Sequence, residues 1–111
     1  MKIKYLALCL PLVFGVSAAQ ADSPTYKQVS PILQANACLA CHQVDNKVVG
    51  PAYKEVAEKY KDDAANAELL ANHIKNGSSG VWGSIPMPPN AGISDEDITI
   101  VVDWLMAGAP N

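Results

Sequence analysis

The stretch "NACLACHQV", residues 36–44, constrains the fold of this chain more than any other feature of the sequence. Cys38 and Cys41 are separated by two residues, and His42 follows directly. Two thiols about one helical turn apart and a neighbouring imidazole can all face the same side of the chain. We therefore expect the rest of the chain to fold around a group that these three side chains bind.

The N-terminal segment has the three parts of a secretory signal peptide. Two lysines precede the apolar run 5–16, and Ala19 and Ala21 have the A-x-A spacing of a cleavage site. A membrane-spanning helix needs about 20 predominantly apolar residues, so this run is too short to be an anchor. We expect residues 1–21 to be removed after export and the mature chain to act in the periplasm.

Residues 22–111 are then expected to form one small domain, because no repeat or linker divides them. This mature chain holds 6 lysines and 11 acidic residues, a formal net charge of −5. The negative charge argues against nucleic acid or an anionic membrane as a partner. A domain of this size buries a modest core and often needs a disulfide, a metal or a cofactor for stability.

Apolar residues recur with helical spacing through most of this domain, and no segment alternates with period two. The sequence therefore predicts an all-α domain. The expected helices are one that begins with Ser30 as N-cap and Pro31 as first residue, one over "AYKEVAEKY" (52–60), one over about 66–76 that ends at Gly77, and a last one capped by Ser94. The glycine- and proline-rich segment 77–92 is expected to be irregular.

The C-x-x-C-H spacing is the signature of covalent c-type haem attachment. The two thiols of Cys38 and Cys41 can add to the two vinyl groups of one porphyrin, and His42 can then bind the iron as the proximal ligand. Three alternative interpretations of the cysteine motif explain fewer of its features. A zinc site needs two further ligands, and only His73 is left. A thioredoxin-like redox pair normally lies in a βαβ unit, and a structural disulfide leaves His42 unexplained.

The sixth ligand of such an iron decides what the protein can do. The candidates are Met87, Met106 and His73, and Met87 is the one that lies in irregular backbone, between prolines that stiffen the loop. We expect Met106 to be a core side chain. Ligation by His42 and Met87 saturates the iron and predicts a one-electron carrier. The alternative function is a ligand-binding or peroxidatic haem protein with a labile sixth site, which carbon monoxide binding to the reduced protein would reveal.

The segments "CLACH", "VGPAYKEVA" and "IKNGSSGVWGSIPMPPN" resemble the short bacterial class I cytochromes c of the cytochrome c-551 type. The resemblance runs from about residue 30 to 107. It implies the class I fold of four to five short helices, with the first and last helices crossing and one haem c in a crevice. It also implies a monomeric carrier between a membrane quinol-oxidising complex and a terminal reductase or oxidase, rather than an enzyme.

The same resemblance implies roles for four further residues. The carbonyl of Pro51 would accept the Nδ1–H of the proximal histidine, and the indole of Trp82 would contact a haem propionate. Asn90 would hydrogen-bond the ligand sulfur, and His73 would lie near an inner propionate. Trp104 is expected in the core. An apolar contact patch for partners is expected where Leu39, Ile85 and Pro86 flank the haem edge.

Overall fold

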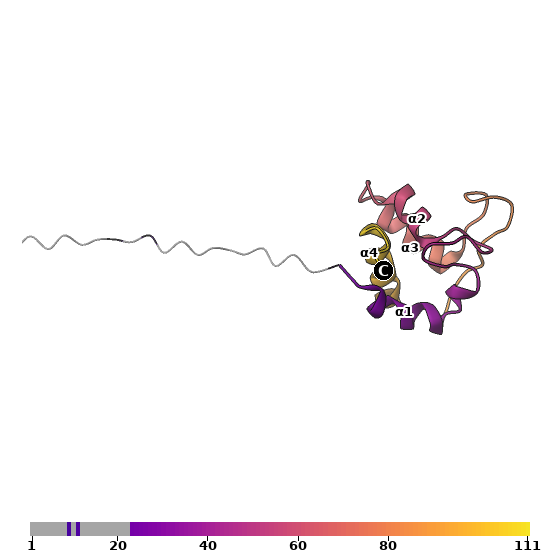
Figure 1. Cartoon of the computed structure of the whole chain (residues 1–111), viewed down its shortest axis with the longest axis horizontal. Helices are drawn as coiled ribbons and strands as arrows, with labels where there is room; N and C mark the ends of the chain where they lie inside the picture. The colour runs from indigo at the N-terminus through magenta and orange to yellow at the C-terminus, as the bar shows by residue number, and fades with distance from the viewer. Residues whose placement is uncertain (1–8, 10, 12–22) are drawn as a thin grey trace, which may run out of the picture.

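The computed structural model describes residues 9, 11 and 23–111, and the expected leader and its cleavage site lie almost wholly outside this range. Within it the chain forms four α-helices and one 3₁₀ helix, with two isolated β-bridges in place of a sheet (Figure 1). The all-α prediction is confirmed. The helices are α1 (Tyr26–Ala35), η1 (Cys38–Ala40), α2 (Tyr53–Tyr60), α3 (Asn66–Asn76) and α4 (Asp95–Met106).

The predicted start of the first helix was wrong. Helix α1 begins four residues before Ser30, with Thr25 as its N-cap, and Pro31 lies inside it. Thr25 and Gln28 form a capping box: the threonine side chain accepts from the Gln28 N–H, and the Gln28 side chain accepts from the Thr25 N–H. This cap, together with burial of Val29 on the added turn, outweighs the hydrogen bond that proline cannot donate.

The boundaries of the other helices follow their capping residues. Helix α2 starts where the Glu55 side chain accepts the Ala52 N–H at 3.3 Å. Helix α3 ends at Gly77, whose φ of 81° favours glycine. At the start of α4 the Ser94 hydroxyl accepts from the Asp97 N–H at 3.1 Å, and three acidic residues occupy the first turn. Negative charge there is favoured by the helix dipole.

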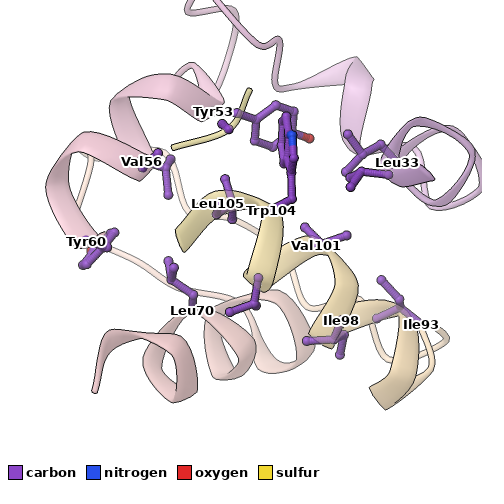
Figure 2. Packing of buried hydrophobic residues seen from close by; sticks show 14 residues of the cluster. Leu33, Tyr53, Val56, Tyr60, Leu70, Ile93, Ile98, Val101, Trp104 and Leu105 are labelled. Atoms are coloured by element: carbon purple, nitrogen blue, oxygen red, sulfur yellow. The ribbon is translucent and has the colours of Figure 1, made fainter. Parts of the chain in front are cut away.

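Helix α4 is the centre of the core, and the other three α-helices pack on it. Its Trp104 is completely buried, and the indole N–H donates to the Pro110 carbonyl at 2.8 Å. Tyr26 of α1 and Tyr53 of α2 contact the same indole, with ring centroids 6.0 and 5.2 Å away. Figure 2 shows α4 between the side chains of the other helices. Helices α1 and α4 are in contact, and the expected core position of Trp104 is confirmed.

In the part of the chain that the structure describes, no helix is long and apolar enough to cross a membrane. The loop between α3 and α4 extends away from the helices, as the orange segment in Figure 1 shows. Together with η1 and the start of α2, this loop frames the candidate site.

Candidate functional site

A cleft opens between the cysteine motif on one side and the α3–α4 loop on the other. Its empty space, counted out to the open mouth, is about 1090 Å³. Seven of the eight predicted site residues line it: Cys38, Cys41, His42, Pro51, His73, Trp82 and Met87. Asn90 does not.

The cysteine motif forms a tight turn at the wall of the cleft. Ala37 takes a left-handed conformation with φ 56°, and η1 follows it. The His42 N–H then donates to the Cys38 carbonyl at 2.9 Å, so the motif coils by about one helical turn. Burial raises the pKa of the Cys38 thiol, and the neighbouring Cys41 raises it further, although a backbone hydrogen bond opposes both. Both cysteines are free thiols in this structure.

The imidazole of His42 is held in one orientation by Pro51. Its Nδ1 lies 2.7 Å from the Pro51 carbonyl oxygen. A carbonyl can only accept, so Nδ1 carries the ring proton and Nε2 keeps its lone pair. A hydrogen bond of this kind fixes the tautomer and the orientation of an imidazole that binds a metal. This contact is the one that the family resemblance implies.

Gly50 allows this approach because it has no side chain. A Cβ at position 50 would lie 2.5 Å from Cε1 and 2.9 Å from Nδ1 of His42, closer than atoms can pack. The sequence interpretation did not single out Gly50, although its place directly before Pro51 was a signal for it.

We expect Gly50→Ala to displace the His42 ring from Pro51. Overpacking of this kind costs about 1–3 kcal/mol, so the free energy of unfolding of the haem-loaded protein should fall by that amount. Denaturant titration followed at the haem absorption band measures it. Gly92→Ala is the matched control, because nothing lies within 4 Å of its added Cβ and its φ is not positive. Equal midpoints for the two variants would contradict this steric account.

Met87 is held on the loop side of the cleft by its own backbone. Its N–H donates to the Ser78 carbonyl at 2.8 Å, and its carbonyl accepts from the Ser78 N–H at 3.1 Å. This pair closes the loop 78–87 on itself, next to Gly77. A Cβ at Gly77 would lie 2.6 Å from the Met87 carbonyl oxygen. Met87 is half-buried, and Met106 packs against the core from α4, as expected.

The other predicted site residues take different positions. Trp82 lies on the loop, 37% exposed, with the ammonium of Lys59 5.4 Å from its ring centroid. His73 lines the cleft from the last turn of α3. The Asn90 side chain donates to the Ile74 carbonyl at 3.2 Å, so in this structure Asn90 ties the loop to α3.

Three observations indicate that the cleft fits a haem c. Cys38, Cys41 and His42, whose side chains would attach the haem and bind its iron, lie on one wall of the cleft. The thioether side chain of Met87 also lines the cleft. Most of the lining side chains that come from the helices are apolar, among them Leu33, Val56, Leu70, Val101 and Leu105, so the lining suits a largely apolar macrocycle. The hydroxyl of Tyr53, another lining residue, is buried without a hydrogen-bond partner. The zinc alternative gains no support, since residues 23–111 bring no three His, Cys, Asp or Glu side chains together as a metal site.

Comparisons with known proteins show the family to which this chain is similar. The family model described as cytochrome c matches residues 27–109. Cytochrome c-552 of Nitrosomonas europaea is 50% identical over 95 residues, which cover 86% of this chain and 84% of that protein. Cytochrome c-551 of Pseudomonas aeruginosa is 49% identical over 105 residues, covering 95% and 98%.

Solved structures give the same result. The crystal structure of wild-type Nitrosomonas europaea cytochrome c552 has a TM-score of 0.68 and 52% identity, covering 71% of this chain and 98% of that one. The class 1 cytochrome MtoD of Sideroxydans lithotrophicus ES-1 has a TM-score of 0.62 and 31% identity, covering 71% and 90%. The chain therefore belongs to the cytochrome c family, with the class I fold and one covalently attached haem c, and is a small electron carrier rather than an enzyme.

Proposed function

We propose that Cys38 and Cys41 hold the haem as thioethers and that His42 and Met87 are its two axial ligands. The observation that carries this proposal is the fixed tautomer of His42, whose Nδ1 is committed to Pro51 at 2.7 Å and whose Nε2 is free to bind. Met87 is the methionine that lines the same cleft. When bound, the haem supplies an iron that alternates between the ferric and ferrous states.

The residues around the ligands favour electron transfer over substrate binding. Two protein ligands leave no position for a substrate, and a thioether raises the reduction potential. The lining side chains from the helices are mainly apolar, which disfavours the extra positive charge of the ferric state. Pro51 and the Ser78 pair keep His42 and Met87 in place, so little rearrangement need accompany each electron.

The propionate end of the haem is proposed to lie beside Trp82 and His73, as the family resemblance implies. The structure adds Lys59, whose ammonium lies over the faces of Trp82 and Tyr60, with ring centroids at 5.4 and 5.7 Å. This contact joins α2 to the α3–α4 loop and places a positive charge next to the indole. A negatively charged propionate would be stabilised there.

Electrons are proposed to leave through the apolar rim of the cleft. Ile85 is 65% exposed, and Val49 and Val81 on the same lining are 48% and 39% exposed. Pro86 lines the cleft beside Ile85, whereas Leu39 lies on η1, partly packed against the core. An apolar rim brings partners close without strong charge steering, so the rate should depend only modestly on salt.

We expect Ile85→Gln to slow electron exchange several-fold while leaving the haem spectrum unchanged, because it places a polar amide at the point of contact. The self-exchange rate between ferric and ferrous copies, measured by NMR line broadening, needs no other partner. Leu69→Gln is the matched control, since Leu69 is exposed on α3 and does not line the cleft. Equal slowing by both variants would show that the rim has no special role.

The cellular role follows from the leader and the family resemblance. We propose that the mature chain, residues 22–111, carries electrons in the periplasm from a membrane quinol-oxidising complex to a terminal reductase or oxidase. Membranes supplied with quinol should reduce the purified holoprotein, and an inhibitor of the quinol-oxidising complex should stop this. Holoprotein that stays ferric while the membranes oxidise quinol with other acceptors would contradict this role.

A further inference from the structure

The loop between α3 and α4 is fixed at its base, where its two ends meet α3. Ser78 and Met87 are joined by two backbone hydrogen bonds, at 2.8 and 3.1 Å. The backbone N–H and the side-chain amide of Asn90 both donate to the Ile74 carbonyl, at 3.1 and 3.2 Å. These contacts hold the two ends of the loop together and set the position of the Met87 backbone.

The tip of the loop, residues 79–86, is held in a different way. Among the described residues, no backbone hydrogen bond begins or ends in this stretch. A side chain from another element supplies a link instead. The ammonium of Lys59, on α2, lies 5.4 Å from the ring centroid of Trp82 at the tip. The tip is thus joined to α2 by a cation–π contact rather than by its backbone.

Lys59 is well placed to make this link because its own position is fixed by a core residue. Its ammonium also lies 5.7 Å from the ring centroid of Tyr60, which is only 6% exposed. Both distances are within the range of about 6 Å over which a cation is attracted to an aromatic face. None of the ion pairs in the described part of the chain includes Lys59, so no carboxylate there competes with the rings.

The segment from Trp82 to Met87 therefore has an attachment at each end. Met87 is paired with Ser78, and Trp82 is held by Lys59. For the Met87 side chain to swing out of the cleft, this short segment must move, and movement of its Trp82 end breaks the contact with Lys59. Trp82 and Tyr60 line the cleft, whereas Lys59 does not. Lys59 can thus act on the distal side of the cleft through the indole.

We propose that Lys59 is a positioning residue that fastens the tip of the loop to α2 and so keeps Met87 on the iron. The inference rests on the proposed ligation by Met87. It gives the lysine a mechanical role in addition to its charge beside the propionate. An exposed cation–π contact is weak, so its loss should raise the population of loop-open protein by about two- to fivefold.

Imidazole binding to the ferric holoprotein tests this proposal, because imidazole can reach the iron only when Met87 has left it. The apparent affinity then scales with the loop-open fraction. Lys59→Gln should raise the apparent affinity by about two- to fivefold, and Lys59→Arg should restore the wild-type value, since arginine also binds aromatic faces. Lys61→Gln is the matched control. It removes the same charge two residues further on, where the ammonium pairs with Asp62 at 3.4 Å, and should leave the affinity unchanged.

A double-mutant cycle with Trp82→Leu separates the contact from a general effect of charge on the haem. If Lys59 acts through the indole, Lys59→Gln should have no further effect once Trp82 is leucine. An equal effect of Lys59→Gln in both backgrounds, or an effect of Lys61→Gln as large as that of Lys59→Gln, would overturn the proposal.

The same titration distinguishes this proposal from the proposed function. If imidazole binds the wild type as tightly as it binds Met87→Ala, the ligation by Met87 fails. If the wild type resists imidazole and Lys59→Gln resists it equally, only the inference about Lys59 fails.

Discussion

The double variant Cys38→Ala/Cys41→Ala should yield no covalent haem and no appreciable folded protein. A ligand present at 100 times its Kd stabilises the folded state by about 2.7 kcal/mol, and a covalently held haem contributes more. Domains of this size are stable by about 5–15 kcal/mol in total. In the proposed arrangement the haem would fill the cleft that α2, α3 and the loop line, so its loss should remove much of the core. Haem staining of denaturing gels and circular dichroism measure the two effects.

Cys9→Ala is the control for the double variant. Cys9 lies in the expected leader, so this substitution should leave the yield of holoprotein unchanged. Each single variant, Cys38→Ala or Cys41→Ala, should retain at most one thioether and accumulate poorly. A colourless, folded double variant at normal yield would contradict the assignment of these cysteines.

Met87→Ala should open the sixth position of the iron. Carbon monoxide should then bind the reduced protein stoichiometrically, whereas the wild type should not bind it. The reduction potential should also fall, because the thioether that favours the ferrous state is gone. Truncation of a partly buried methionine should cost about 2 kcal/mol or more in unfolding free energy. Optical titration of the reduced protein with carbon monoxide measures the main effect.

Met106→Ala is the matched control, since Met106 packs against the core from α4. It should lower stability without opening the iron to carbon monoxide. The reverse pattern, with binding to the Met106 variant and none to the Met87 variant, would show that the distal ligand was assigned to the wrong methionine. Carbon monoxide binding to the wild type would instead favour the ligand-binding or peroxidatic alternative.

Helix boundaries could be predicted where one residue decides them. Gly77 ends α3 and Ser94 caps α4 because each acts through local backbone geometry, which sequence displays directly. The start of α1 could not be predicted from Pro31 alone. Its position depends on the capping box of Thr25 with Gln28 and on the contact of Tyr26 with Trp104, which lies 78 residues further along the chain.

The candidate site likewise has features that could be predicted from the sequence and features that could not. The cysteine motif is local, so its chemistry could be predicted from spacing. The approach of Pro51 to His42 was implied by the family resemblance, and in the structure the Pro51 carbonyl oxygen lies 2.7 Å from Nδ1 of His42. The contacts of Tyr53 with His42 and of Lys59 with Trp82 join separate segments of the chain and became visible only in three dimensions.

The central claim is that the chain carries one haem whose iron is saturated by the protein and exchanges single electrons. Spectroelectrochemical titration of the holoprotein, run under argon and again under carbon monoxide, tests it most directly. We predict one reversible wave with a slope of about 59 mV per tenfold change in the ratio of oxidised to reduced protein, as a one-electron couple requires. The midpoint should be the same under both gases. A midpoint that rises under carbon monoxide would show an open iron site and contradict the account.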